Sequence, residues 1–357
     1  MSAAPEVAKF RRVLATTLGW SFDDNDVDTL AQVLDRRAEA TRLSAAAYLS
    51  RLIGGDWDTE LTVLTELLTI NETYFFRHGE QFRALSEAAL PERIRDRAAQ
   101  RVLRMLSVGC SSGEEAYTLA IVGLQAAIGP DWIVSVLGLD ASPAVLERAN
   151  AARYSAWSLR ETPDAVRERW FRHTDGHYEL DPRVRGAVQF RLCNVAADDA
   201  SLWRPGQYDV VFCRNLLMYL TPEVQAALVH RMTRVLAPGG FLFLGHTDSL
   251  GSRPEGLEPQ HTHGTFYYRR GEPTAPAQLP EPARSRPSIV QAPAPSKAAP
   301  PTGPASAGSA SGGSAAWPGA AGAAASGTSG AVAGGPAAGG TAARWPTPGG
   351  MSSGGPA

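Results

Sequence analysis

The chain has 357 residues, of which 20% are charged and 44% are hydrophobic, so it is long enough for two domains and a large core. Its 34 basic and 36 acidic residues nearly balance, which argues against a general nucleic-acid coat protein. The sequence has no 18-residue apolar run, no apolar signal core at its N-terminus and only three cysteines, and it therefore predicts a reduced, cytoplasmic protein without a membrane span or a disulfide framework.

Residues 1–70 predict a small all-helical domain, because they contain no convincing strand. Phe10 and Leu14 fall on one face of a first helix. Three further helices are expected, over 25–43, 45–53 and 59–68. The helices 25–43 and 45–53 carry a basic face, for which a solvated surface is the ordinary explanation.

From 101 to 270 the pattern changes to strands alternating with helices, which predicts an open, largely parallel α/β sheet. The expected strands are 102–108, 133–139, 188–192, 208–213, 241–244 and 265–268. The expected helices are 114–128, 143–150 and one that opens at Thr221-Pro222 and ends at 237–240. An insert at about 155–187 is expected to hold a short helix and a hairpin.

The remaining segments complete the predicted domain organisation. Residues 71–100 form a linker and helix between the helical domain and the sheet domain. Residues 271–357 consist mostly of Ala, Gly, Pro and Ser, with few large apolar side chains. Such a composition buries too little apolar surface to offset its chain entropy, which predicts a disordered tail.

The carboxyl ends of the first two predicted strands carry residues typical of a nucleoside-binding site. The first strand runs into small residues between Gly109 and Gly113, which let a ligand approach the backbone. The second strand is followed by Asp140, where an acid can accept hydrogen bonds from two ribose hydroxyls. The loop is neither GxGxxG nor GxxxxGK[ST], and its spacing loosely matches the glycine-rich loop of S-adenosylmethionine-dependent methyltransferases.

Further motifs accompany this loop in a fixed order. They are NETYFFR at 71–77, CSSGEE at 110–115, CRNLLMY at 213–219 and Gly-His at 245–246. In this order and spacing they resemble the chemotaxis receptor methyltransferase (CheR) family over about residues 1–270. The resemblance implies an α/β fold with a Rossmann-like class I S-adenosylmethionine methyltransferase sheet, a small all-helical N-terminal domain and a short inserted β-subdomain.

The resemblance also implies the residues of a cofactor site. The positions expected to bind S-adenosylmethionine are Asn71, Thr73, Arg77, Glu115, Asp140, Asn194, Val195, Asn215 and Leu216. The position of Asp140 holds the ribose, and the pair at 194–195 flanks the adenine. The pair at 215–216 borders the methionine portion and the methyl group. Arg77 and Tyr219 border the reacting centre and are the expected catalytic residues.

The activity that the resemblance implies is transfer of a methyl group to glutamate side chains of chemotaxis receptors, with S-adenosylhomocysteine as the second product. A glutamate has a pKa of about 4.3, so it is ionised at neutral pH and needs no general base. A basic helix bearing Arg36, Arg37 and Arg42 would dock on the acidic methylation helices of the receptors. We expect a monomer that acts without nucleic acid and without inserting into the membrane.

A metal site is not expected. The histidine pairs 173/177 and 261/263 have spacings that could suggest one, but no third ligand motif accompanies either pair. The insert is short around 173–185, which argues against a site there for the receptor's C-terminal peptide.

Several of these residues also have a purely structural interpretation. Asp140 could cap the following helix, and Asn194 and Asn215 could be turn residues. Arg77 could form a surface ion pair, and Tyr219 could only fill space. Two alternative functions stay open at this point: a catalytically silent module that senses S-adenosylmethionine, and a methyltransferase with a non-receptor acceptor.

Overall fold

The chain was analysed as a computed structural model, which describes residues 4–55, 57–69, 71–127, 129–197, 199–248, 250 and 255–271. The chain divides into two compact units, Met1–Ala283 and Arg284–Ala357. All described residues belong to the first unit. The predicted disordered tail, apart from Gly271, lies outside the described residues. None of the described helices is long and apolar enough to cross a lipid bilayer.

The N-terminal part of the chain is helical. Its elements are α1 (Ala4–Leu18), η1 (Asp24–Asp26), α2 (Val27–Thr41), α3 (Ala45–Ile53) and α4 (Asp58–Leu68). In α1 the buried side chains Phe10, Leu14 and Leu18 recur every four residues and form one apolar face. Ser44 caps α3 by accepting a hydrogen bond from the backbone of Ala47. The predicted helices 25–43, 45–53 and 59–68 are thus confirmed to within two residues.

A helical stretch follows the linker and contains one irregular turn. It comprises α5 (Gly79–Ala84), a π-helical turn η2 (Leu85–Ala89) and α6 (Leu90–Asp96). Leu85, Ala89 and Leu90 are buried in the core beneath these helices. The π-helical turn could not be expected from periodicity, because it changes the helical repeat within a single turn.

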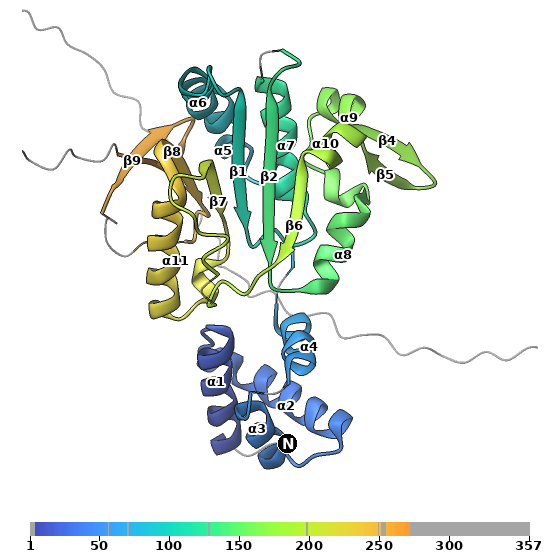
Figure 1. Cartoon of the computed structure of the whole chain (residues 1–357). Coiled ribbons are helices and arrows are strands. Elements are labelled where there is room, and N and C mark those ends of the chain that lie inside the picture. The colour runs from blue at the N-terminus through green and yellow to red at the C-terminus, as the bar shows by residue number, and fades with distance from the viewer. Residues whose placement is uncertain are drawn as a thin grey trace, which may run out of the picture. The chain divides into compact units, whose positions relative to one another are not determined.

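A seven-stranded sheet forms the centre of the molecule (Figure 1). Its strands are β1 (Val102–Val108), β2 (Ile133–Asp140), β6 (Val188–Leu192), β7 (Tyr208–Cys213), β8 (Leu236–Leu244), β9 (Leu257–Thr262) and β10 (Thr265–Arg270). The strand order is β6-β2-β1-β7-β8-β10-β9. The first five strands in this order run parallel, and β10 and β9 pair antiparallel at one edge.

Alternating side chains of the central strands enter two separate cores. In β7, Val211 and Cys213 belong to the core that also contains residues of α1–α3 and α11 (Pro222–Val235). Val210 and Phe212 belong to the core on the opposite face, beneath α5, α6 and α7 (Glu114–Ala126). This period of two places helices on both faces of the sheet, as expected for a buried parallel sheet.

The insert forms a small sheet of its own. It contains β3 (Arg153–Tyr154), β4 (Phe171–Thr174) and β5 (His177–Leu180) in the order β3-β5-β4, with η3 (Trp157–Leu159), α9 (Asp164–Trp170) and α10 (Pro182–Gly186) around it. The expected short helix and hairpin are present, and β3 adds a third strand. The helix α8 (Pro143–Ala151) leads from β2 into this insert (Figure 1).

The largest differences from the prediction are the end of α11 and the strand β9. The predicted turn at 237–240 belongs to β8, because α11 already ends at Val235 and the chain enters the sheet at Leu236. The strand β9 was not expected from its sequence, LEPQHT, which is polar and contains Pro259. It lies at the edge of the sheet, where a residue without a backbone N–H is tolerated.

A buried ion cluster holds α6 against the amino ends of the strands. Asp209, fully buried at the start of β7, accepts hydrogen bonds from Arg93 Nη2 at 2.9 Å and Arg97 Nε at 2.7 Å. Its other oxygen accepts the backbone N–H of Arg104 at 2.9 Å. Arg93 also binds Asp96 at 2.8 Å, so the buried guanidinium and the buried carboxylate are both well bonded.

Candidate functional site

The predicted motifs meet at the carboxyl edge of the sheet. Parallel strands end at the same edge, so the loops after β1, β2, β7 and β8 come together there. β1 lies between β2 and β7. From β1 the chain adds β2 and β6 on one side of the sheet and then adds β7 and β8 on the other side, so the direction of strand addition reverses at β1. In open α/β sheets such a switch point is where ligands bind.

The loop after β1 has a backbone that favours glycine. Gly109 and Gly113 have φ angles of 76° and 92°, and Ser111 between them also lies in the left-handed region, at 48°. A Cβ on Gly113 would lie 2.9 Å from the Cβ of Ala149, which real contacts do not allow. At Gly109 an added Cβ would meet Leu216 at 3.2 Å, so the loops after β1 and β7 are in close contact.

Asp140 joins the end of β2 to this glycine loop. Its Oδ2 accepts the backbone N–H of Ser111 at 2.8 Å, and its Oδ1 accepts that of Ser142 at 3.0 Å. The N-cap of α8 is Ser142, so the alternative in which Asp140 caps this helix is not what the structure shows. Burial raises the pKa of Asp140 above its usual value, although these backbone hydrogen bonds oppose the change.

Glu115 is buried in the first turn of α7 and is fully bonded within the chain. Ser107 Oγ donates to its Oε1 at 2.7 Å, and Arg214 Nε donates to its Oε2 at 2.6 Å. Arg214 also donates to the backbone oxygen of Arg77 and to Gln81 Oε1, at 3.2 Å. One guanidinium thus ties the loop after β7 to α7 and to the NETYFFR segment.

Arg214 was not among the predicted site residues, although its motif was. The signal that could have revealed it is the acidic pair Glu114-Glu115 at a buried helix start, since a buried carboxylate needs a cationic or hydrogen-bonding partner. An arginine directly after the buried strand β7 is the natural candidate for that partner.

The NETYFFR segment runs along the glycine loop. Ser111 Oγ donates to the backbone oxygen of Asn71 at 3.4 Å, and Asn71 Nδ2 donates to Thr69 Oγ1 at 3.1 Å. Thr73 is half-buried. Arg77 Nη1 donates to the backbone oxygen of Glu72 at 2.8 Å, so this half-buried guanidinium is held by the segment itself and forms no surface ion pair among the described residues.

Asn194 and Val195 follow β6, next to the end of β2. The backbone N–H of Cys193 donates to the backbone oxygen of Asp140 at 2.8 Å, which brings this segment beside the acid. Asn194 Oδ1 accepts the N–H of Ala196 at 2.9 Å, so the turn interpretation holds for this oxygen. Val195 is buried.

Asn215 and Leu216 are positioned by a carboxylate that the prediction missed. Asn215 has a left-handed φ of 56°, and its N–H donates to Asp248 Oδ2 at 2.6 Å. Asp248 also accepts the N–H of Gly245 at 3.0 Å and that of Met218 at 3.3 Å. Burial raises its pKa despite these bonds. The quoted Gly-His motif stopped two residues short of this acid.

Tyr219 lies at the end of η4 (Leu217–Tyr219), with 37% of its surface exposed. Its backbone oxygen accepts the N–H of Ser21 at 2.9 Å, and the neighbouring Leu220 forms a β-bridge with Trp20. Its phenol makes no hydrogen bond within the described part of the chain. The side chain is therefore accessible rather than packed into the core.

The three predicted docking arginines differ from one another. Arg36 and Arg42 are exposed, on α2 and at its C-terminal cap. Arg37 instead binds the buried Glu60 through Nε at 2.7 Å and Nη2 at 2.8 Å, and Tyr48 donates to the same carboxylate at 2.7 Å. Arg37 therefore stabilises the helical region. Of the three arginines, Arg36 and Arg42 are the ones whose exposed charges could contact a partner.

A cavity of about 560 Å³ lies between α5 and α7. It is lined by residues of α5, η2 and α7 and by the insert, among them Phe76, Glu80, Phe82, Val122 and Glu161. None of the nine predicted cofactor residues lines it. This cavity is therefore separate from the predicted cofactor site.

The residues at the carboxyl edge fit S-adenosylmethionine. The glycine loop packs closely against the protein at Gly109 and Gly113, where an added side chain would meet Leu216 or Ala149. An ionised carboxylate has about four lone-pair sites, and Asp140 uses only some of them on backbone N–H groups. Two polar side chains of the linker, Asn71 and Thr73, are half-buried next to this loop.

An open sheet of this order, with a small-residue loop after β1 and an acid ending β2, is the class I methyltransferase fold. The family model described as CheR methyltransferase, SAM binding domain, matches residues 71–264, which is more than half of the chain. The chain therefore belongs to the CheR methyltransferase family, and the predicted family and S-adenosylmethionine as cofactor are confirmed.

Named relatives agree with this assignment. The probable biofilm formation methyltransferase WspC of Pseudomonas aeruginosa is 33% identical over 268 residues, 73% of this chain and 61% of the relative. Chemotaxis protein methyltransferase 1 of the same species is 30% identical over 282 residues, 75% of this chain and 99% of the relative. Chemotaxis protein methyltransferase 2 of Vibrio cholerae is 31% identical over 69% of this chain and 85% of the relative. The chain spans about three fifths of the WspC relatives that it matches.

Proposed function

We propose that this chain transfers a methyl group from S-adenosylmethionine to glutamate side chains of chemotaxis receptors. The observation that carries the proposal is the meeting of all the family's motifs at one edge of the sheet, within the segment that the family model matches. Three relatives at 29–31% identity that are named chemotaxis protein methyltransferases support it. In this proposal the enzyme acts as a cytoplasmic monomer.

The chain's own residues would bind and orient the reactants. Asp140 would hold the ribose, and Asn194 and Val195 the adenine. Asn71, Thr73 and Glu115, with the backbone at Asn215-Leu216, would hold the remaining polar parts and the methyl end. Because Glu115 is already bonded to Arg214, its contribution includes fixing the position of that guanidinium.

The reaction itself needs little from the protein besides orientation. S-adenosylmethionine supplies a methyl group on a sulfonium, so the glutamate oxygen forms the new C–O bond while the C–S bond breaks and its electron pair stays on sulfur. The accessible phenol of Tyr219 would hold the incoming carboxylate, and Arg77 would orient it. Orientation of this kind can contribute about 7–11 kcal/mol to lowering a barrier.

The reaction class is tested with methyl-labelled S-adenosylmethionine and membranes that contain the organism's own receptors. We expect label on a receptor-sized band, and we expect mild base to release it, because a glutamyl methyl ester is hydrolysed there. Cofactor binding without transfer would favour a silent sensor module. Transfer to a different protein would favour a non-receptor acceptor, and a panel that includes acceptors of biofilm-related signalling would reveal it, since one relative carries that name.

The catalytic roles are tested separately from cofactor binding. In Tyr219→Phe we expect slower methyl transfer with an unchanged dissociation constant for S-adenosylmethionine, because only the acceptor side loses a hydrogen bond. Arg77→Ala is expected to slow transfer as well. Normal turnover in both variants at saturating cofactor would remove these residues from the catalytic set.

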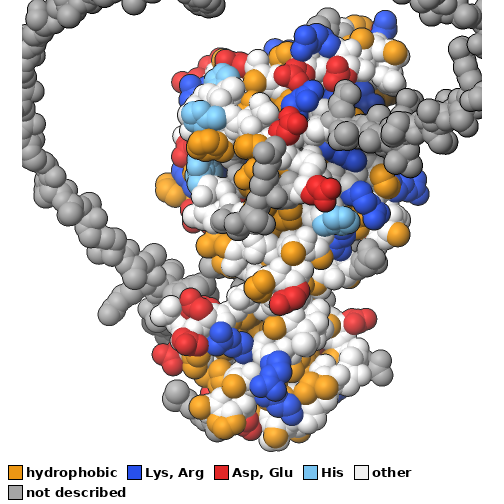
Figure 2. All heavy atoms as spheres, turned by 90° about the vertical axis from the view of Figure 1, so that its left-hand side faces the viewer, with side chains coloured by type: hydrophobic (Ala, Val, Ile, Leu, Met, Phe, Trp, Pro, Cys, Tyr) orange, Lys and Arg blue, Asp and Glu red, His pale blue; other side chains and the backbone are white. Residues whose placement is uncertain are grey.

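Receptor docking is proposed for the exposed cations Arg36 and Arg42. Figure 2 shows Lys and Arg side chains interspersed with Asp and Glu side chains on the visible face. The double variant R36E/R42E should slow receptor methylation, and more so at low salt, because opposite charges speed encounter. A matched control is R95E/R104E, which changes the same charge at exposed arginines elsewhere. Equal effects of the two double variants would contradict docking through α2.

A further inference from the structure

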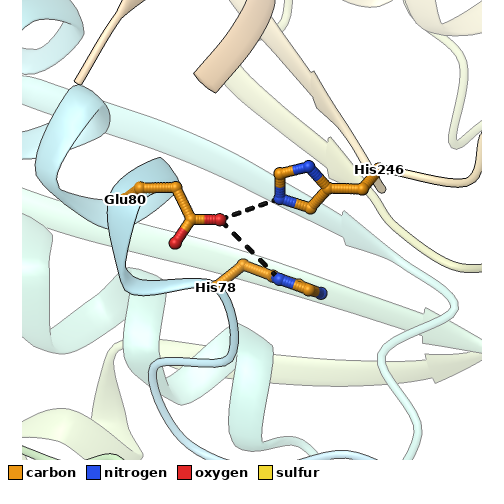
Figure 3. Close-up of side chains that lie close together, drawn as sticks. All are labelled: His78, Glu80 and His246. Carbon is orange, nitrogen blue, oxygen red and sulfur yellow. Dashed lines mark hydrogen bonds and ion pairs between the residues drawn. The ribbon is translucent and has the colours of Figure 1, made fainter. Parts of the chain in front are cut away.

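Three side chains from two distant parts of the sequence converge beside the carboxyl edge of the sheet (Figure 3). His78 precedes α5, Glu80 lies in its first turn, and His246 follows β8. Glu80 Oε1 lies 2.8 Å from His246 Nε2 and 3.7 Å from His78 Nδ1. The two imidazole rings are 4.5 Å apart between centroids.

This arrangement has the composition and the spacing of a metal site. One ligand atom from each residue lies within 4.8 Å of the others. Two imidazoles and one carboxylate are a known ligand set for zinc, with bonds of about 2.0–2.2 Å. Tetrahedral ligands at that distance lie about 3.3 Å from one another, so the three side chains need only small rotations to close around an ion.

We propose that His78, Glu80 and His246 bind a divalent transition-metal ion of the zinc class. His78 and Glu80 are half-buried and His246 is exposed, so the site is open on one side and leaves a fourth position for water. His78 has a left-handed φ of 62°, which is uncommon for a residue other than glycine and which turns its side chain from the linker toward Glu80.

Arg214 is a buried cation near His78. The nearby charge of Arg214 disfavours a cation, yet this guanidinium is already paired with Glu115 at 2.6 Å.

A bound ion would join two segments that border the cofactor site. His78 directly follows Arg77, and His246 directly follows Gly245, whose N–H shares Asp248 with Asn215. The ion would hold these segments together from outside the reacting centre. The inference does not depend on the proposed methyl transfer, because binding is measured without acceptor or cofactor.

The test uses the full chain without an affinity tag of histidines. Titration with Zn²⁺ should show one saturable site, and Co²⁺ should give the visible absorption of a four-coordinate ion. We expect Glu80→Gln and His246→Ala to weaken Zn²⁺ binding by at least about tenfold, since loss of even an outer partner of a metal ligand costs 10–100-fold. Zn²⁺ should also raise the unfolding temperature of the unchanged protein and not that of the variants.

A second His–Glu pair provides the matched control. His263 Nε2 lies 3.0 Å from Glu87 Oε2, and the described residues place no third ligand beside this pair. His263→Ala should therefore leave Zn²⁺ binding unchanged. Absence of saturable binding, or equal affinity in the unchanged protein and His246→Ala, would overturn the proposal. Such a result would leave a hydrogen-bonded cluster and no metal site.

Discussion

The two ends of strand β7 carry two buried ion clusters that differ in purpose. At the amino end, Asp209 is bonded to Arg93, Arg97 and a backbone N–H, and the cluster fixes α6 to the sheet. At the carboxyl end, Arg214 binds Glu115 and reaches the linker. The first cluster joins only elements of the scaffold, whereas the second lies among the motifs of the cofactor site.

The backbone shows the same difference. Four non-glycine residues with left-handed φ angles lie in the loops of the carboxyl edge, at Phe76, His78, Ser111 and Asn215, whereas Arg101 has such an angle at the amino edge, before β1. Such conformations cost free energy and persist where the surroundings determine them. Burial also raises the pKa of Asp140 and of Asp248 at this edge, so both carboxylates are held there against their preference for water. The comparison predicts that changes at the amino end affect stability and changes at the carboxyl end affect binding.

The largest effect is expected for Asp209→Ala. Arg93 is 2% exposed and would keep a buried charge without its main partner, which costs about 3–5 kcal/mol of unfolding free energy. Urea unfolding measures the loss, and calorimetry on the folded protein should still find S-adenosylmethionine binding with an unchanged dissociation constant. A loss below about 1 kcal/mol, the range of exposed ion pairs, would show that the cluster is not a main support of the fold.

Asp140→Asn tests the opposite end of the sheet. Loss of a hydrogen bond to a charged acceptor costs about 1.5–3 kcal/mol, so we expect S-adenosylmethionine to bind at least about tenfold more weakly. The unfolding free energy is measured in parallel, because the asparagine NH2 group cannot accept one of the two backbone N–H groups, of Ser111 and Ser142, that the carboxylate accepts. The pKa of Asp140 is higher in the folded state than in the unfolded state. Its ionisation therefore lowers the unfolding free energy as pH rises from the ordinary to the raised pKa. Asparagine does not ionise, so the variant does not show this loss of stability. Unchanged cofactor affinity would contradict the ribose role.

An effect of similar size, this time on stability, separates two neighbouring arginines in α2. Arg37→Met removes the cation from the buried Glu60 and should cost about 1.5–3 kcal/mol, whereas Arg36→Met should leave stability nearly unchanged. Burial disfavours the charge on Glu60, but hydrogen bonds from Arg37 and Tyr48 outweigh it and lower its pKa. This contribution is present above the ordinary glutamate pKa and is lost as pH falls through the lowered value, so the stability difference between the unchanged protein and Arg37→Met should narrow over that pH range. Equal stability of the two variants would show that the Arg37–Glu60 pair contributes nothing.

The sequence predicted the sheet well, because its signals are local. Strands 102–108, 188–192 and 208–213 were predicted with their observed bounds, since 102–108 and 208–213 are mostly apolar and 188–192 alternates apolar with polar residues. The helix starts at Pro143 and Pro222 were predicted as well, from a hydroxyl cap followed by proline. The polar strand β9 was missed, because its pairing with β10 and not its composition makes it a strand.

The site was predicted only as far as its motifs extend. Asp140 and the glycine loop follow from strand ends, and the remaining cofactor residues came from the family resemblance. Arg214 and Asp248 were missed because their partners, Glu115 and Asn215, are 99 and 33 residues away in the chain. The cluster of His78 with His246 was missed for the same reason, since a search for closely spaced histidines cannot find a pair that only the fold brings together.

The smallest effect is expected at an ion pair that is as short as those of the buried clusters. Arg101 Nη1 lies 2.6 Å from Asp131 Oδ2, just before β1 and β2, but the two side chains are 54% and 67% exposed. Water solvates both charges whether or not they meet, so Asp131→Asn should change the unfolding free energy by about 0–1 kcal/mol. Urea unfolding beside Asp209→Ala then compares two carboxylates near the same edge of the sheet at similar contact distances. If both variants lost the same unfolding free energy, contact distance and not burial would determine what an ion pair contributes to stability in this protein. The burial of the clusters at the two ends of β7 would then not explain what they contribute.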